Sequence, residues 1–299
     1  MQVGITGSTG LIGSQLSSYL TGKGHQVLRI TRKTPAGPGE ISWDPSSGRL
    51  DNAALEGVDA VFHLAGENIA GGRWTAERKR RIRESRIQGT RLLAQALAHL
   101  PDPPKVLVSV SAVGYYGDRG DSQLAEDSGP GKGFLADLCR EWESAIEPAS
   151  RRGIRVVQPR LGTVLSPAGG ALALMLPVFR LGIGGRIGSG NQFMSWIAME
   201  DLLRVFHHSM DCESLRGPVN AVSPNPVTNL ALSKTLGRVL ARPVIFALPA
   251  FAARIIFGEM ADEALLASAR VSPVKLMASG FQFGYPELEP ALRRALKRP

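Results

Sequence analysis

The sequence predicts an α/β fold, in which a doubly wound parallel sheet carries a smaller substrate lobe and a C-terminal helical appendage. In the first half of the chain, short apolar stretches alternate with segments of helical periodicity, and a glycine-rich turn follows the first stretch. After residue 160 the pattern becomes irregular. Strands that alternate with helices build parallel βαβ units, so the first half predicts a Rossmann-type sheet.

The expected elements follow in order along the chain. The apolar stretches expected to form strands are Gln2–Thr6, Gln26–Thr31, Ala60–Leu64, Val106–Ser111 and Arg155–Arg160. A helix is expected from about Met199, and short helices bounded by proline and glycine from about Leu248. We therefore expect a Rossmann domain at 1–165, to which later segments can also contribute core strands, interleaved substrate-lobe segments at 166–247 and a small helical domain at 248–299.

Composition supports a folded protein. The chain has 299 residues, 43% hydrophobic and 20% charged, a balance that excludes dominant disorder. The net charge of +9 favours anionic partners. Cys139 and Cys212 form no Cys-x-x-Cys pair, and no secretory signal follows Met1, so we expect a cytoplasmic location. No apolar run approaches the roughly 20 residues that cross a bilayer, and the histidines have no ligand spacing, so neither a membrane nor a metal is expected.

The turn after the first expected strand predicts a nucleotide site. Its spacing is Gly-x-x-Gly-x-x-Gly, and a helix begins within it. In such a turn the first glycine allows a tight bend, the second lets the backbone approach a pyrophosphate, and the third lets helix and strand pack closely. The residues expected to contact the cofactor here are Gly7, Ser8, Thr9, Gly10, Leu11, Ile12 and Gly13.

The end of the second expected strand favours NADP over NAD. An NAD site typically has an acidic residue there to hold the ribose 2′-hydroxyl. This chain has Thr31, Arg32 and Lys33, whose cations suit a 2′-phosphate. The alternative is that Arg32 and Lys33 only contact water on a loop.

A long helix is expected over Glu77–Leu100. Its charged residues 78–83 are interpreted as a solvated face rather than a nucleic-acid surface, because no aromatic residues interleave with them. Arg86 falls on the apolar stripe and therefore needs an anionic partner. Cofactor phosphate or ribose is one candidate, and the carboxylate of Glu67 or Glu84 is the other.

Several further motifs resemble one family. The Gly7–Gly13 turn, Leu64-Ala65-Gly66 and the segment Ser111–Gly117 resemble the extended short-chain dehydrogenase/reductases. Narrower features are similar to an atypical, epimerase-like subgroup with an extra C-terminal domain of unknown function, namely His63–Ala70, Arg73-Trp74, Ser85-Arg86 and Gly280–Pro286. The resemblance implies NADP(H) bound by the Gly7–Gly13 turn, Thr31, Arg32, Leu64, Ala65, Gly66 and Arg86.

The family's chemistry is only partly present. Its members use a Tyr-x-x-x-Lys pair as acid and base, and alignment by Glu143 puts Leu135 and Cys139 in those places. The nearest substitutes are Ser111, Tyr115 and Tyr116, which otherwise shape a pocket. The substrate lobe would supply Arg160, Arg186, Gln192 and Trp196.

Two functions follow as expectations. The first is an NADP-dependent oxidoreductase or epimerase-like enzyme that acts on an unknown small substrate. The second is a catalytically degenerate NADPH-binding sensor or scaffold, which loss of the Tyr and Lys pair would permit. A nucleic-acid partner ranks last, and the chain is compatible with a homodimer.

Overall fold

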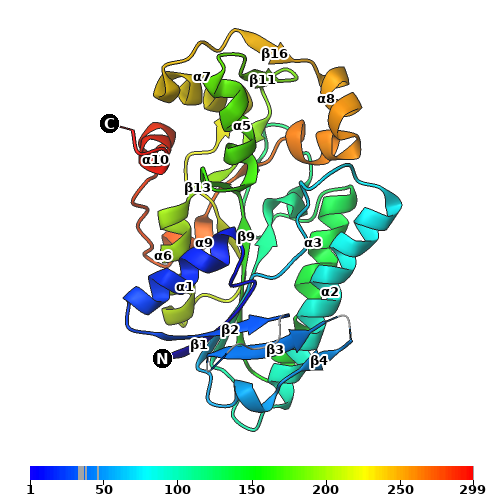
Figure 1. The fold of residues 1–299 in the computed structure, drawn as a ribbon, viewed down its shortest axis with the longest axis vertical. Coiled ribbons are helices and arrows are strands. Elements are labelled where there is room, and N and C mark those ends of the chain that lie inside the picture. The colour runs from blue at the N-terminus through cyan, green and yellow to red at the C-terminus, as the bar shows by residue number, and fades with distance from the viewer. Residues whose placement is uncertain (33–36, 38, 46, 299) are drawn as a thin grey trace.

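A mainly parallel sheet forms the centre of the molecule (Figure 1). The structure is a computed structural model that describes residues 1–32, 37, 39–45 and 47–298. The strand order is β14-β9-β6-β5-β1-β2-β3-β4, and β7 also pairs with β9. Only the β3–β4 pairing in this sheet is antiparallel among the described residues. The strands are β1 (Gln2–Thr6), β2 (Gln26–Thr31), β3 (Glu40–Asp44), β4 (Arg49–Leu50), β5 (Ala60–His63), β6 (Val106–Ser109), β7 (Ser111–Ala112), β9 (Arg155–Leu161) and β14 (Gly217–Ala221).

The strand order reverses beside β1. This strand pairs with β2 on one side and β5 on the other, so that Thr6 lies opposite both Ile30 and His63. In open α/β sheets a ligand crevice forms at the carboxyl ends of the strands where the order reverses. The residues that follow Thr6 and His63 therefore flank the expected crevice.

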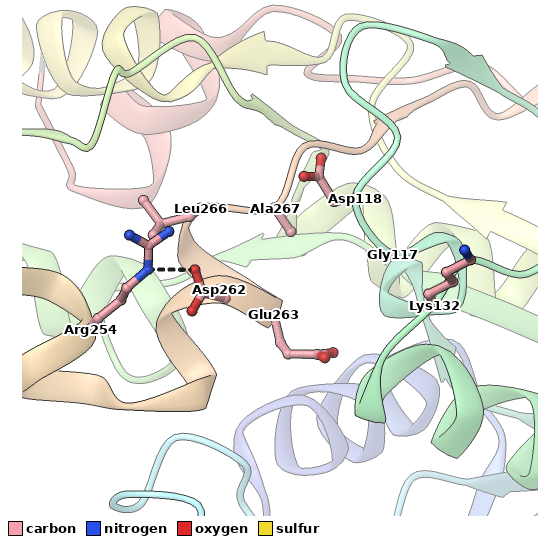
Figure 2. A pocket seen from close by; sticks show the side chains of 8 residues that line it. All are labelled: Gly117, Asp118, Lys132, Arg254, Asp262, Glu263, Leu266 and Ala267. Atoms are coloured by element: carbon pink, nitrogen blue, oxygen red, sulfur yellow. Dashed lines mark hydrogen bonds and ion pairs between the residues drawn. The ribbon is translucent and has the colours of Figure 1, made fainter. Parts of the chain in front are cut away.

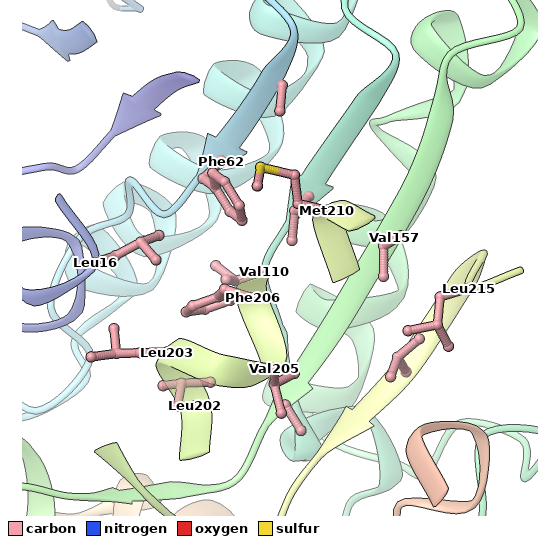
Figure 3. Close-up of a cluster of buried hydrophobic side chains, with 14 of the residues drawn as sticks. Leu16, Phe62, Val110, Val157, Leu202, Leu203, Val205, Phe206, Met210 and Leu215 are labelled. Carbon is pink, nitrogen blue, oxygen red and sulfur yellow. The ribbon is translucent and has the colours of Figure 1, made fainter. Parts of the chain in front are cut away.

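Helices cover both faces of the sheet, which confirms the predicted α/β class. On one face α1 (Leu11–Gly22) packs against α6 (Met199–Asp211), and Figure 3 shows Leu16, Phe62 and Phe206 converging there. The other face is covered by α2 (Ala76–His99) and α4 (Glu147–Arg151), with α3 (Phe134–Ser144) beside α2. Both faces of the parallel strands are buried, as their continuous apolar sequences require.

A second lobe stands beyond the carboxyl ends of the strands (Figure 1). Its core joins α5 to α7 and α10 through buried leucines and Trp196. Its helices are α5 (Gly170–Arg180), α7 (Asn229–Leu240), α8 (Ala250–Phe257) and α10 (Leu288–Ala295). Its short strand pairs are β10 (Thr163–Leu165) with β13 (Trp196–Ala198), β11 (Gly185–Ile187) with β16 (Phe246–Leu248), and β12 (Phe193–Met194) with β15 (Val227–Thr228).

The C-terminal segment is more than a helical appendage. It contains the π-helical turn η3 (Ala261–Leu265) and α9 (Val274–Ala278), but also β17 (Arg270–Val271). Strand β17 pairs in parallel with β8 (Gln123–Leu124) from the first half of the chain. In the described part of the chain, no helix has both the length and the apolar character to cross a membrane.

Candidate cofactor crevice and its surroundings

The glycine-rich turn packs backbone against backbone at the strand-order reversal. Gly7 has a φ of +67°, and a Cβ atom there would lie 2.9 Å from the Ala65 amide nitrogen. A Cβ atom on Gly13 would lie 2.2 Å from the Gly7 carbonyl oxygen. Gly10 is different, because its added Cβ would meet only the Gly7 carbonyl, at 3.3 Å. Gly7 and Gly13 are thus required by the fold, whereas Gly10 leaves an open approach to the backbone.

Helix α1 begins in this turn without a side-chain cap. Its N-cap is Gly10, Ser8 is buried, Thr9 is exposed, and Leu11 and Ile12 are half-buried. A helix N-terminus has unpaired N–H groups and a positive dipole end, which together favour an anion. The turn can therefore hold a phosphate group.

A buried hydrogen-bond chain fixes the segment that follows β5. The Leu64 and Ala65 amides donate to Thr6 Oγ1 at 3.1 and 3.2 Å. His63 Nδ1 lies 2.8 Å from the same oxygen, and His63 Nε2 lies 2.9 Å from Thr90 Oγ1. Because two amides use the Thr6 lone pairs, its hydroxyl donates to Nδ1, and the ring proton is on Nε2. Burial lowers the pKa of His63 to about 4, so the imidazole is neutral at pH 7.

Arg86 lies under this segment. Its NH1 donates to the carbonyl oxygens of Glu67 and Ile82, at 3.0 and 3.3 Å. The guanidinium lies 5.0 Å from the centre of the Trp142 ring, and a Cβ on Gly66 would lie 3.2 Å from Arg86 Cζ. Arg86 is half-buried, and its partial burial lowers the pKa of the guanidinium.

Neither carboxylate considered as a partner of Arg86 forms an ion pair with it. Glu67 offers its backbone carbonyl, and the Glu84 carboxylate binds Arg80 instead. Among the described residues no carboxylate forms an ion pair with Arg86. A cation in this position has unused capacity for an anionic ligand.

The carboxyl end of β2 lies next to the carboxyl end of β1. Thr31 is half-buried and Arg32 is exposed. Lys33, which the sequence grouped with them, lies outside the described residues.

The catalytic candidates contact a buried ion pair between Arg160 and Glu143. Glu143 accepts from Arg160 Nε and NH2, both at 2.8 Å, and from Ser111 Oγ at 2.7 Å. Arg160 NH1 donates to the Tyr116 hydroxyl at 2.9 Å, and its guanidinium carbon lies 3.5 Å from the centre of the Tyr115 ring. Arg160 is only 2% exposed and Tyr116 is fully buried. The network holds β7, β9 and α3 together.

Accessibility separates the three catalytic candidates. Tyr116 donates to Asn220 Oδ1 at 2.7 Å, and burial raises its pKa. Ser111 is 2% exposed, whereas Tyr115 is half-buried. A ligand can therefore reach Tyr115, while contact with Ser111 or Tyr116 requires rearrangement.

Leu135 and Cys139, which the sequence aligns with the family's Tyr and Lys, lie in apolar surroundings. Leu135 and Cys139 lie on buried positions of α3, and burial raises the pKa of the Cys139 thiol to about 11. A thiol with that pKa is neither a nucleophile nor a useful acid at neutral pH.

The substrate-lobe candidates do not converge. Arg186 is exposed on β11. Gln192 is 6% exposed, and its amide donates to the carbonyls of Ile187 and Leu265. Trp196 is fully buried and donates to the Asn225 carbonyl. With Arg160 also buried, only Arg186 of the four presents substantial surface to a ligand.

A pocket of about 340 Å³ lies between the first half of the chain and the C-terminal segment (Figure 2). Asp118 and Lys132 lie across it from Arg254 and Asp262, which pair at 2.9 Å. The pocket is lined by Gly117, Asp118, Lys132, Arg254, Asp262, Glu263, Leu266 and Ala267. Gly117 follows Tyr116 directly, so the pocket adjoins the catalytic candidates. No group of His, Cys, Asp and Glu within the described residues is suited to hold a metal ion.

Glu263 contributes to the site through a contact that the sequence does not reveal. Its two carboxylate oxygens accept from the Phe134 and Leu135 amides, each at 3.0 Å, and so cap the N-terminus of α3. Gly133, the N-cap residue, leaves the space for this carboxylate. The contact joins residues about 130 positions apart, which no local pattern reveals.

A phosphate-loop turn at the strand-order reversal, with the half-buried Arg86 cation beside it, is typical of a dinucleotide-binding α/β protein. More narrowly, the chain belongs to the NAD dependent epimerase/dehydratase family, whose model matches residues 3–220. A domain of unknown function matches residues 248–295.

Relatives match almost the whole chain. An epimerase family protein of Mycobacterium tuberculosis is 46% identical over 297 residues, 99% of this chain and 98% of the relative. The epimerase family protein SDR39U1 of Homo sapiens is 38% identical over 296 residues, 98% of this chain and 99% of the relative.

Solved structures of related proteins share the fold. The crystal structure of human SDR39U1 with NADPH has a TM-score of 0.92 at 37% identity, with 100% of both chains covered. A nucleoside-diphosphate sugar epimerase from Corynebacterium glutamicum has a TM-score of 0.83 at 38% identity, covering 99% of this chain and 58% of that one.

Proposed function

We propose that this protein binds NADPH in the crevice between β1 and β5. The observation that carries the proposal is the Gly7–Gly13 turn closed against Ala65, beside an Arg86 cation without a described carboxylate partner. Backbone N–H groups and a guanidinium are the donors that a pyrophosphate needs. The human relative solved with NADPH supports this assignment.

Arg32 is proposed to recognise the 2′-phosphate. Calorimetric titration of the purified protein with NADPH and with NADH tests both proposals. Arg32→Asp should weaken NADPH binding more than tenfold and NADH binding little, because only NADPH carries the 2′-phosphate. Arg91→Asp, an exposed cation on α2, is the matched control.

The outcomes separate the two claims. Equal losses of NADPH and NADH affinity in Arg32→Asp would remove Arg32 from 2′-phosphate recognition. Absence of binding heat with NADPH in the unmodified protein would overturn the cofactor proposal itself. Arg86→Gln should weaken both dinucleotides, since the groups proposed to contact it are common to both.

We propose further that the protein is an NADP-dependent oxidoreductase or epimerase-like enzyme for a small polar substrate. NADPH supplies a hydride when bound. Tyr115 is the accessible phenol that can give a proton to the substrate oxygen, and the stacked Arg160 guanidinium holds its ring. The adjoining 340 Å³ pocket has the size of a small-molecule site and carries both charge signs.

The second candidate is an NADPH-binding sensor or scaffold. It is supported by the burial of Leu135 and Cys139, the residues that the sequence aligns with the family's acid and base. Two readouts in fractionated metabolite extracts discriminate between the two functions: loss of NADPH absorbance for an oxidoreductase, and formation of an epimerised product without net cofactor consumption for an epimerase. An active fraction whose turnover falls strongly in Tyr115→Phe, at unchanged NADPH affinity, supports the enzyme. If no fraction oxidises NADPH or yields an epimerised product while NADPH protects the protein from proteolysis, the sensor is favoured.

A further inference from the structure

The second lobe carries a concentration of exposed apolar side chains. Nine large ones, each 43–77% exposed, lie on α5, the β11–β16 region and α8: Leu174, Val178, Leu181, Ile183, Ile245, Phe246, Phe251, Ile255 and Ile256. We call these nine residues the apolar rim. The rest of the described chain contributes only Met1, Val274 and Met277 to the same class. These elements occupy the end of the molecule farthest from β2 and β3 (Figure 1).

Hydrogen bonds join the elements that carry much of the apolar rim. Arg242 Nε donates to the Arg180 carbonyl at 2.9 Å, which joins the end of α5 to the segment before β16. β11 then pairs in parallel with β16. The Gly188 amide donates to the Leu248 carbonyl at 2.8 Å, next to the start of α8. An exposed apolar area that extends over adjoining elements marks an interaction site rather than scattered surface residues.

The charged side chains in the chain segments that supply the apolar rim are all positive. Residues 148–199 and 214–258 contain no aspartate or glutamate, although they supply every rim residue. Arg180, Arg186 and Arg242 have no carboxylate partner among the described residues, while Arg254 pairs with Asp262. A surface of this kind attracts an anionic partner and repels a second copy of itself.

We propose that the apolar rim binds the surface of an anionic lipid bilayer. Large apolar side chains enter the boundary between headgroups and acyl chains, while neighbouring arginines meet lipid phosphates. The attachment is peripheral and needs no spanning helix. It goes beyond the proposed NADPH function and does not depend on it.

A single tryptophan reporter tests insertion directly. The four native tryptophans, Trp43, Trp74, Trp142 and Trp196, are each at most 8% exposed, so their emission should respond little to lipid. Phe251→Trp places a reporter in the apolar rim, and Met277→Trp places the matched control at an exposed apolar position on α9. Vesicles of phosphatidylcholine with phosphatidylglycerol should shift only the Phe251→Trp emission to the blue. Vesicles of phosphatidylcholine alone should give a smaller blue shift of that emission. Added salt should reduce the shift seen with the anionic vesicles, because it screens the attraction between arginines and lipid phosphates.

Vesicle co-sedimentation gives the second measurement. Arg180→Gln and Arg242→Gln should each reduce partitioning onto the anionic vesicles about fivefold, because each cation near such a surface contributes that factor. Leu181→Ser should also reduce it, whereas Arg91→Gln should not. An unchanged melting temperature in each variant shows that the protein remains folded.

Three results would overturn the proposal. One is that the unmodified protein does not sediment with anionic vesicles. Another is self-association by light scattering that Leu181→Ser abolishes, which would assign the apolar rim to a second copy. The third is retention on polyglutamate without retention on vesicles, which would assign it to an acidic protein surface.

Discussion

His63 is the single residue whose ionisation has the clearest consequence for stability. Its folded-state pKa of about 4 lies below the usual value of 6.5, so the unfolded chain binds a proton more readily. Stability therefore falls as the pH drops from 6.5 towards 4 and is fully present above 6.5. Because of His63, we expect the free energy of unfolding to fall by about 2 kcal/mol between pH 7 and pH 5, as measured by urea denaturation.

The matched variants isolate that contribution. His63→Gln removes the titrating ring and should remove this part of the pH dependence, although the variant is less stable at pH 7. His99→Gln, at an exposed position on α2, should retain the full dependence. The same slope in His63→Gln as in the unmodified protein would contradict the assignment.

At this scale the sequence could predict which residues are present but not which side chains contact each other. The absence of the Tyr and Lys pair was visible from Leu135 and Cys139, because their spacing to Glu143 is local. The partner of Arg160 was not visible, since Glu143 and Tyr116 reach it from different elements. Arg160 was expected to contact substrate, whereas its surroundings show a buried ion pair with Glu143.

The β1–α1 element distinguishes a glycine needed for folding from one needed for a ligand. Gly13→Ala places a Cβ 2.2 Å from backbone, so α1 must move and the melting temperature should fall by several degrees. Gly10→Ala meets one atom at 3.3 Å, so its melting temperature should change little. NADPH affinity should nevertheless fall at least tenfold in Gly10→Ala, as measured by calorimetry. Equal melting temperatures for the two variants would refute this division of roles.

Helix α3 depends on a cap supplied by another part of the chain. Glu263→Ala removes two charge-assisted hydrogen bonds from the first turn of α3 and should cost about 1–2 kcal/mol in denaturant unfolding. Asp262→Ala, which breaks the neighbouring exposed ion pair with Arg254, should cost well under 1 kcal/mol. If both variants lose the same stability, Glu263 is not acting as a cap.

The expected strands agree with the structure where the sequence is apolar and the strand is buried. The expected Gln2–Thr6 and Gln26–Thr31 coincide with β1 and β2. β3 was not anticipated, and β14 was anticipated only as a core strand from an unspecified later segment. β14 begins with Gly217 and Pro218, which disfavour strands in general, but it lies at the edge of the sheet, where a missing proline N–H is tolerated.

At the scale of the whole molecule, residues 248–299 are tied into the rest of the protein rather than appended to it. The buried Asp201 carboxylate accepts from the Gly284 and Tyr285 amides, both at 2.8 Å. The Lys275 amide donates to Glu126, and β17 extends β8. Leu276 and Leu292, both fully buried, complete two different hydrophobic clusters.

This integration predicts the result of truncation. A chain that ends at Ala247 exposes both clusters and leaves Asp201 buried without its amide partners, so it should be insoluble or bind a hydrophobic dye strongly. A chain that ends at Ala295 keeps α10 and should unfold with the cooperativity of the full protein. Soluble yield, dye fluorescence and thermal unfolding of the two truncations measure the difference. If the shorter chain bound NADPH and melted in a single sharp transition, the C-terminal segment would be an independent domain, because the sheet would then need none of its contacts.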